Sequence, residues 1–281
     1  MPFPRVKSWI ARYPRLRTFL RSVKASLLGT GARTALRGNQ TVDRLDFRMT
    51  YRNHVQTLLR AHPNETALHL AVGGAFEIVG ALERDVLIHH GLKPQDYLID
   101  VGCGSGRLAK FLSPYLSGRY LGIDVVRELI DHARVISNRT DWKFVMGEGL
   151  TIPERDNRAD MVCFFSVLTH LLHEQSYVYL NEARRVLKPK GRVVFSFLEF
   201  AQASHWNIFE SDIAAIGTHT PLNVFIERTA IAAWANHLGM TVEAIYNAEI
   251  PLTQPIHAAD GSIALKERGN LGQSICVLVK G

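Results

Sequence analysis

Residues 97–106 read YLIDVGCGSG, an apolar strand pattern that runs directly into a turn rich in glycine. Glycines at alternate positions allow the backbone to turn sharply and leave room for a ligand against bare peptide. The next segment, 106–116, has the pattern of a helix. Because the first turn of a helix has free backbone N–H groups, this arrangement predicts a binding site just beyond the strand.

The same alternation of strand, turn and helix repeats along the rest of the chain. We predict strands at 97–102, 119–124, 143–146, 159–166, 191–198, 241–247 and 274–280. We predict helices between them at 106–116, 127–138, 173–187 and 229–238. This order predicts an α/β fold, a Rossmann-like doubly wound sheet of seven strands with helices on both faces. No helix is predicted between the last two strands, so we expect them to form an antiparallel terminal hairpin.

The chain upstream of the sheet is predicted to be helical, in two parts. Residues 1–42 form an amphipathic arm, with apolar residues in steps of three and four from Trp9 to Leu28. Residues 43–91 form a helical cap that leads into the main domain at 92–281. We therefore expect an N-terminal helical extension on one α/β domain.

The spacing of the glycines narrows the choice of ligand. Gly102, Gly104 and Gly106 follow the pattern G-x-G-x-G, whereas a dinucleotide fingerprint reads G-x-G-x-x-G. Asp100 stands two residues before the first glycine, where it could face a positively charged group of the ligand. Asp124 ends the second predicted strand, where a carboxylate can accept hydrogen bonds from both hydroxyls of a ribose.

Four segments in this order resemble the class I S-adenosylmethionine-dependent methyltransferase superfamily over residues 76–281. They read IDVGCGSGRLAKFL, YLGIDVVRELIDHA, ADMVCFFSVLTHL and EARRVLKPKGRVVFSFL. The resemblance implies S-adenosylmethionine as cofactor, with Glu148 and Gly149 flanking the adenine and Phe165 and Ser166 beside the methyl group. The glycines would shape the methionine and ribose pocket, and the acid after the second strand would hold the ribose. The cofactor-binding residues predicted in this way are Asp100, Gly102, Cys103, Gly104, Gly106, Asp124, Glu148, Gly149, Phe165 and Ser166.

The last two segments are similar to family members that methylate small molecules, lipids and sugars. We expect transfer to an oxygen of a small hydroxylated acceptor, such as a sugar, a glycolipid or a secondary metabolite. A hydroxyl benefits from a general base, and the candidates are His170 and His205. In similar enzymes the segment after the fifth strand covers the acceptor, so we expect 201–228 to be such an insert, irregular in structure. The three cysteines have no metal-ligand spacing, and no metal site is predicted.

The positive charge of the chain is concentrated in the arm. Residues 1–42 contain no acidic residue, and the rest of the chain holds 24 of the 33 basic residues against 26 acidic ones. This balance argues against a nucleic-acid surface on the main domain. The basic residues of the arm are Arg5, Lys7, Arg12, Arg15, Arg17, Arg21, Lys24, Arg33 and Arg37.

Several partners suit such an arm. It could lie on an anionic membrane, contact RNA, act as a transit peptide, or pack on its own domain or on a second subunit of a homodimer. The sequence has no apolar run long enough to cross a bilayer and no secretory signal pattern, so we expect a cytoplasmic protein with peripheral membrane contact through the arm. The alternative functions are an RNA methyltransferase that uses the arm and a non-methylating relative that binds S-adenosylmethionine.

Overall fold

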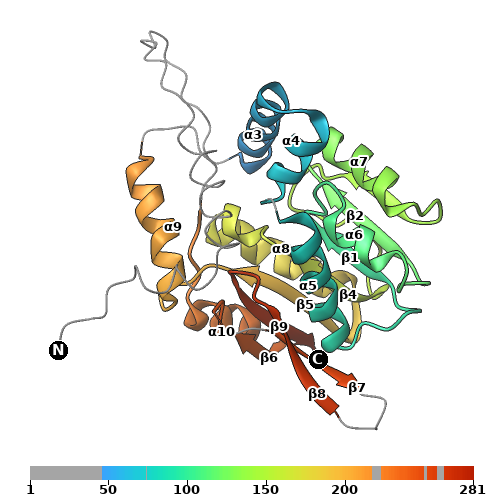
Figure 1. Cartoon of the computed structure of the whole chain (residues 1–281). Coiled ribbons are helices and arrows are strands. Elements are labelled where there is room, and N and C mark those ends of the chain that lie inside the picture. Colours follow the sequence, from blue (N-terminus) through green and yellow to red (C-terminus); the bar gives the residue numbers. More distant parts are fainter. Residues whose placement is uncertain (1–45, 74, 217–222, 250–251, 258–262) are drawn as a thin grey trace, which may run out of the picture.

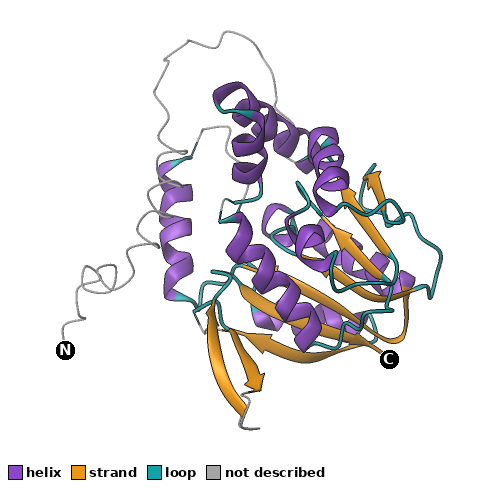
Figure 2. Cartoon of the chain, turned by 45° about the vertical axis from the view of Figure 1, so that its right-hand side comes forward, coloured by secondary structure: helices purple, strands orange, loops and turns teal. Residues whose placement is uncertain are grey.

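The core of the molecule is a seven-stranded sheet with helices on both faces, as the computed structural model shows (Figures 1 and 2). The structure describes residues 46–73, 75–216, 223–249, 252–257 and 263–281. The predicted arm at 1–42 lies outside these residues. The strands of the sheet are β1 (Leu98–Val101), β2 (Tyr120–Asp124), β3 (Lys143–Met146), β4 (Ala159–Phe164), β5 (Leu187–Phe197), β6 (Met240–Tyr246) and β9 (Ser274–Lys280).

The strand order is β3-β2-β1-β4-β5-β9-β6, and the connection reverses direction beside β1. β1 to β5 pair in parallel, whereas β9 is antiparallel to both β5 and β6. This topology confirms the predicted doubly wound sheet with an antiparallel end. Because β1, β2 and β4 are parallel, the loops that follow them lie at the same edge of the sheet. Such folds bind ligands at this edge, at the point where the strand order reverses.

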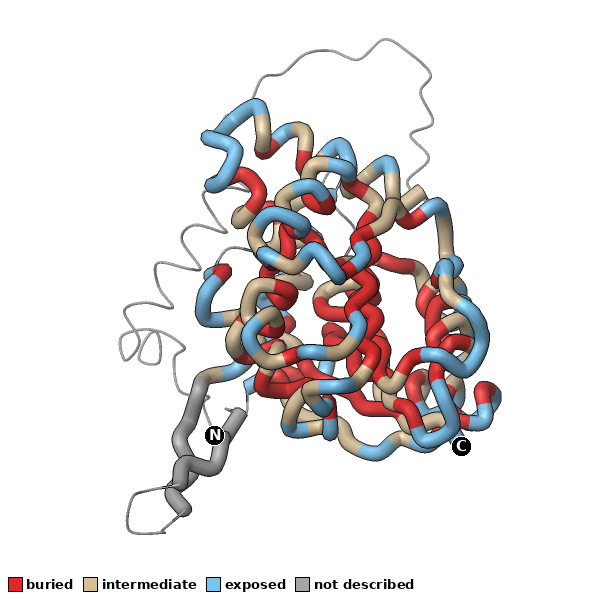
Figure 3. Tube along the Cα trace, turned by 90° about the vertical axis from the view of Figure 1, so that its right-hand side faces the viewer, coloured by how far each residue is buried: buried red, intermediate tan, exposed pale blue. Residues whose placement is uncertain are grey.

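Each face of the sheet is covered by its own group of helices. α5 (Phe76–His89), α6 (Arg107–Leu112) and α7 (Arg127–Ser137) pack on one face through a cluster that includes Leu98, Leu112 and Ile130. α8 (His173–Val186) and α10 (Arg228–His237) cover the other face. The buried residues accordingly run through the middle of the molecule in Figure 3.

Two further helices, α3 (Phe47–Ala61) and α4 (Asn64–Ala71), lie over the carboxyl edge of the sheet beside the start of α7 (Figure 1). Asp46 caps α3, because its side chain accepts hydrogen bonds from the first backbone N–H groups of the helix. Val55 and Leu68 pack with Leu129 of α7 in a small apolar cluster of their own. The segment predicted as a helical cap therefore becomes a cover over the ends of β1 and β2.

Two elements differ from the prediction. The segment 201–228 contains α9 (Ala203–Ala214), a regular helix where we expected irregular structure. A separate hairpin of β7 (Leu252–His257) and β8 (Ile263–Gly269) stands between β6 and β9 in the chain. Neither element was predicted, because neither packs an apolar face into the core of the sheet. Helix α9 has a single buried residue, and the two strands of the hairpin pair only with each other, so their sequences lack the apolar periodicity that marks a helix or strand.

In the described part of the chain, no single helix is long and apolar enough to cross a membrane. One bent pair, Asn64–Ala71 with Phe76–His89, passes that test together by length and composition.

Candidate active site

The glycine-rich turn after β1 requires its glycines for two separate reasons. The φ angles of Gly102, Gly104 and Gly106 are 76°, 54° and 89°, in the left-handed region that other residues avoid. A Cβ atom at Gly102 would lie 2.3 Å from Val167, and one at Gly104 would lie 2.4 Å from Val72. The turn is therefore held against the loop after β4 on one side and the end of the α4 segment on the other.

Replacing Gly104 by alanine separates these two requirements. We expect the left-handed backbone alone to cost about 1–2 kcal/mol, with a further loss from the contact between the new Cβ and Val72. Val72→Ala in the same chain should recover only the second part. Gly239→Ala is the matched control, since Gly239 has a φ of 63° and open space around it. Urea unfolding measures all four proteins, and equal losses in G104A and G239A would contradict the packing argument.

Asp124 ties the end of β2 to the glycine-rich turn. Its side chain accepts hydrogen bonds from the backbone N–H of Gly104 at 2.9 Å and of Val126 at 3.0 Å. Burial raises the pKa of Asp124 to about 6, and the backbone hydrogen bonds oppose this rise. The carboxylate thus stands at the predicted ribose position, beside the turn it helps to shape.

Asp100 lies beneath the turn rather than in the space above it. Its carboxyl accepts hydrogen bonds from the Tyr120 hydroxyl at 2.5 Å and from the Cys163 thiol at 3.5 Å. Burial raises the pKa of Asp100 to about 7, and the charge of Glu83 adds to that rise. Cys103 is buried on the same side. Both residues support the turn from within the core, and neither side chain faces a ligand in this arrangement.

Arg107, the residue directly after the turn, anchors it to the N-terminal helices. The guanidinium forms an ion pair with Glu83 of α5, and both side chains are buried. It also donates to the carbonyl of Val72. The Ser105 hydroxyl donates to the carbonyl of Leu68 at 2.9 Å, so the turn and the α4 segment are joined at two points. Nothing in the local sequence pattern indicates these contacts, which join distant parts of the chain.

The part of the site that is predicted to bind adenine lies at the carboxyl ends of β2 and β3 and is open to solvent. Glu148 is exposed, and its carbonyl accepts a hydrogen bond from Arg48 at 2.7 Å. The carbonyl of Gly149 accepts from the Tyr179 hydroxyl at 2.7 Å. A cleft of about 510 Å³ opens here, with lining residues Asp46, Arg48, Met49, Arg52, Arg127, Met146, Gly147 and Glu148.

At the end of β4, Ser166 has a strained backbone with a φ of 58°. Its N–H donates to the Ser196 hydroxyl at 2.7 Å, and its own hydroxyl accepts from the Gln273 amide at 3.1 Å. The amide oxygen of Gln273 is buried and has no hydrogen-bond partner among the described residues. Phe165, just before Ser166, is 8% exposed. This corner beside the turn therefore offers a hydroxyl and an unused acceptor atom.

His170 lies next to this corner, in the short turn Leu168–His170. Its ring stacks on Tyr51 of α3 with 6.4 Å between the ring centroids. The ring of His54, also from α3, lies near Tyr51 as well, with 6.3 Å between the centroids. Burial, followed by the charge of His170, lowers the pKa of His54, which favours a neutral imidazole. Tyr51 and His54 were not predicted as site residues, because only the folding of α3 over the sheet brings them here.

The structure buries His205 among backbone groups. His205 is fully buried, and both ring nitrogens face backbone groups: Nδ1 lies 3.0 Å from the N–H of Glu199 and Nε2 lies 3.2 Å from the carbonyl of Gly272. The Glu199 carboxylate is in turn paired with Arg228. This geometry favours a supporting role for His205 and leaves His170 as the histidine of the site.

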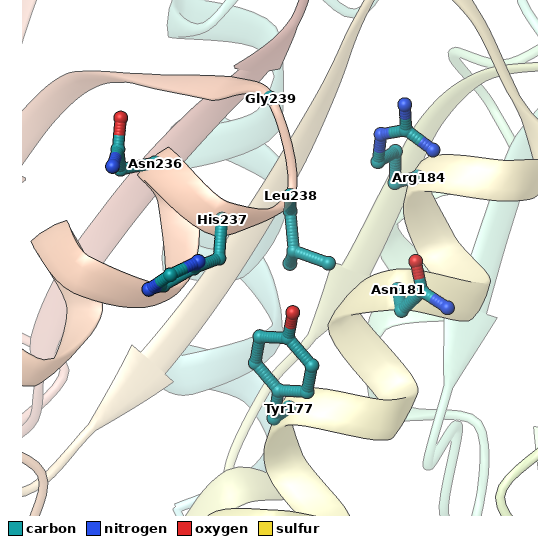
Figure 4. Close-up of a pocket in the computed structure, with 7 residues that line it drawn as sticks. All are labelled: Tyr177, Asn181, Arg184, Asn236, His237, Leu238 and Gly239. Atoms are coloured by element: carbon teal, nitrogen blue, oxygen red, sulfur yellow. The ribbon is translucent and has the colours of Figure 1, made fainter.

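A second cleft, of about 410 Å³, lies between α8 and the turn from α10 to β6 (Figure 4). Tyr177 and Arg184 from α8 face His237 across it. The turn leads into the amino end of β6, which is parallel to β1, so this cleft lies at the opposite edge of the sheet from the glycines. Within the described residues, no group of three or more His, Cys, Asp or Glu side chains could hold a metal ion.

Residues 99–195 match the family model described as a methyltransferase domain. The chain is 37% identical over 107 residues to a 37.1 kDa protein in transposon TN4556 of Streptomyces fradiae, covering 36% of this chain and 30% of that protein. It is 29% identical over 147 residues to a sterol 24-C-methyltransferase of Gibberella zeae, covering 50% of this chain and 37% of that one. The chain thus spans about a third of the length of these two relatives.

Among solved structures, the magnesium protoporphyrin IX methyltransferase of Synechocystis PCC 6803 with bound SAH has a similar fold. Its TM-score is 0.51 at 15% identity, with 98% of this chain and 100% of that chain covered. The order of the strands, the glycine-rich turn after β1 and the acid after β2 agree with this likeness. Residues 99–195 therefore form a methyltransferase domain, and the fold around them is similar to that of a methyltransferase with bound SAH.

Proposed function

We propose that this protein transfers the methyl group of S-adenosylmethionine to an oxygen of a small hydroxylated acceptor. The proposed site for this methyl donor rests on one observation: the N–H of Gly104 donates a hydrogen bond to the Asp124 carboxylate at the carboxyl edge of the sheet. There the turn has no side chains at Gly102, Gly104 and Gly106, and the carboxylate of Asp124 can accept hydrogen bonds from ribose hydroxyls. When bound, the cofactor supplies an electrophilic methyl carbon on a positively charged sulfur.

The residues around the turn suit that ligand. Turns with glycine at alternate positions admit a ligand close to the backbone, and the open cleft at Met146 and Glu148 offers apolar and polar surface for an adenine. Val72 and Val167 lie directly against the turn and would form the apolar walls on either side. The α3–α4 segment would exclude water from the donor, since it covers the same edge (Figure 1).

The acceptor side is the corner formed by Ser166, Gln273 and His170. A hydroxyl of the acceptor can donate to the unpartnered amide oxygen of Gln273, which holds the acceptor oxygen in place. The ring of His170 would take the hydroxyl proton as the carbon–oxygen bond forms, and would later release it to solvent. Tyr51 holds the His170 ring by stacking and so fixes its direction. Positioning of the two reactants would supply much of the rate.

A carbon acceptor is the alternative suggested by the sterol 24-C-methyltransferase relative. Carbon methylation uses an electron-rich double bond as nucleophile, and the base removes a proton after the transfer. The Ser166 hydroxyl and the Gln273 amide, which hydrogen-bond to each other, make this corner polar and favour an oxygen acceptor over an apolar alkene. Carbon-13 NMR of the product made from S-adenosylmethionine labelled in its methyl group distinguishes the two, because a methyl carbon bonded to oxygen resonates far downfield of one bonded to carbon.

Calorimetry with S-adenosylmethionine and S-adenosylhomocysteine tests the donor side directly. We expect both to bind the full chain, and the second to compete with the first. Release of S-adenosylhomocysteine is then measured over a panel of hydroxylated metabolites. No heat with either compound would remove the proposed function, because the donor site would then be absent.

Once an acceptor is found, His170→Ala should lower kcat by about 100-fold, the scale of a lost general base. Binding of S-adenosylmethionine should stay unchanged, since His170 lies on the acceptor side of the turn. His237→Ala is the matched control, because that histidine is exposed in the cleft at the opposite edge. A wild-type kcat in H170A would exclude His170 as the base.

A further inference from the structure

Helix α9 carries an exposed apolar stripe that no described element covers. Trp206, Phe209 and Ile213 follow one another in steps of three and four, so they lie along one side of the helix, and Ile216 follows in the turn after it. Trp206 is 47%, Ile213 52% and Ile216 80% exposed. Figure 1 shows α9 at the left edge of the molecule. A contiguous apolar surface of this kind marks a binding surface.

The start of the stripe rests on an ordered aromatic cluster. The ring of Phe200 stacks on Phe225 at 4.5 Å, and Phe209 packs edge-on to Phe200 at 5.2 Å. Trp206 packs against Phe209 at 5.4 Å, and its indole N–H donates to the carbonyl of Phe200 at 3.0 Å. These contacts hold the exposed rings in one arrangement, so a partner would lose little side-chain entropy in binding them.

The charge around the stripe selects among partners. Glu210 is exposed beside it, and residues 200–216 contain no lysine or arginine. An anionic bilayer would be repelled by this carboxylate. A second copy of the same face would bring like charges together, which is also unfavourable. The partner that fits is therefore an apolar helix with basic residues along its edges.

We propose that this partner is the chain's own N-terminal arm, packed on α9 through residues 15–27. After Pro14, which is tolerated only at the start of a helix, Leu16, Leu20, Val23 and Leu27 repeat in alternating steps of four and three, the spacing of a helix seam that meets another helix. The nine basic residues and the absence of acids in 1–42 complement the exposed carboxylate of Glu210. Arg17, Arg21 and Lys24 directly follow apolar positions of the repeat, where they border the seam.

The chain is long enough to make this contact. The arm lies outside the described residues, which begin at Asp46. The segment between 27 and 46 could extend to roughly 60 Å, more than is needed to reach any side of a domain of this size. The arm of the same molecule is present at a high effective concentration, which favours it over a partner in solution.

This contact bears on the acceptor side of the site. Asp212 of α9 accepts a hydrogen bond from Asn223 at 2.8 Å, and the next residue, Val224, donates its N–H to Thr169 at 2.7 Å. His170 follows Thr169. The arm would therefore buttress the helix whose inner side borders the acceptor corner, and this inference stands whether or not the acceptor is a hydroxyl.

Zero-length carbodiimide cross-linking of the full chain tests the contact. We expect Lys24 to couple to Glu210, and Glu210→Gln to remove that product. Mixing ¹⁴N-labelled and ¹⁵N-labelled protein shows whether the link lies within one chain. Links between differently labelled chains, or no link between the arm and α9, would overturn the proposal.

Hydrogen exchange provides an independent measurement. The variant Leu16→Glu/Leu20→Glu should make the amides of 203–214 exchange about 10-fold faster, because α9 would lose its cover. Leu36→Glu is the matched control, since it adds a charge to the arm outside the seam. Equal exchange in all three proteins would contradict the proposal, as would protection of α9 that occurs only with phosphatidylglycerol vesicles.

Discussion

Replacing Asp124 by asparagine should weaken the binding of S-adenosylmethionine by about 100-fold at pH 8, as expected for two lost charge-assisted hydrogen bonds. An asparagine oxygen can still accept from the N–H of Gly104, so the turn should keep its shape. Calorimetry measures the affinity, and unfolding in urea confirms that the variant is folded. Asp131→Asn on the exposed surface of α7 is the control and should bind like the wild type.

The same carboxyl predicts a pH dependence of binding. Burial raises the pKa of Asp124 to about 6, so the group is protonated below that pH and ionised above it. Only the ionised form accepts hydrogen bonds from both ribose hydroxyls. The affinity of the wild-type protein should therefore rise as pH increases through about 6 and then level off, while D124N shows no such rise. A pH-independent affinity in the wild type would place the ribose elsewhere.

Replacing Arg107 by methionine should lower the free energy of unfolding by about 3–5 kcal/mol, because it leaves a buried carboxylate without its cation. Glu83 is 2% exposed and receives two hydrogen bonds from Arg107. Burial already raises the pKa of Glu83 despite the arginine. The double variant Glu83→Gln/Arg107→Met should regain much of the loss, since the neutral amide carries a smaller cost of burial.

The sign of the pH effect follows from Glu83. Its folded-state pKa in the variant lies above the unfolded value, so the folded state holds the proton more tightly. The loss of unfolding free energy in R107M should be largest at pH values above the folded-state pKa of Glu83. It should shrink as the pH falls toward the pKa of Glu83 in the unfolded chain. Lys110→Met, at a partly exposed pair with Glu77, is the control and should cost at most about 1 kcal/mol. Equal losses of unfolding free energy in the two variants would show that the buried ion pair contributes no more to stability than the partly exposed one.

The sequence was sufficient to predict the sheet and the turn. Strand and helix periods and the glycines of 102–106 are local properties, and the structure confirms the strands, their order of alternation and the antiparallel end. The glycines at alternate positions, followed by a strand that ends in Asp124, were also enough to indicate S-adenosylmethionine as the methyl donor. The reason is physical: left-handed backbone and buried apolar runs each demand particular residues at fixed spacing.

The roles of individual acids could not be predicted in this way. Asp100 was expected to face the ligand, but its neighbours Tyr120 and Cys163 turn it into the core. His205 and His170 look alike in the chain, yet the ring of His205 lies between backbone groups of Glu199 and Gly272, and the ring of His170 stacks on Tyr51. The surroundings of each polar group depend on the tertiary fold.

The chain thus carries the α/β sheet and the donor-binding turn in its local patterns, because period and turn geometry act over a few residues. Only the tertiary structure decided what surrounds that turn. It brought α3 and α4 over the carboxyl edge, paired Glu83 with Arg107 and set Tyr51 and His54 beside His170. Those contacts form when apolar side chains such as Val55 and Leu129 are buried against each other. Which side chains meet in this way depends on how the whole domain packs.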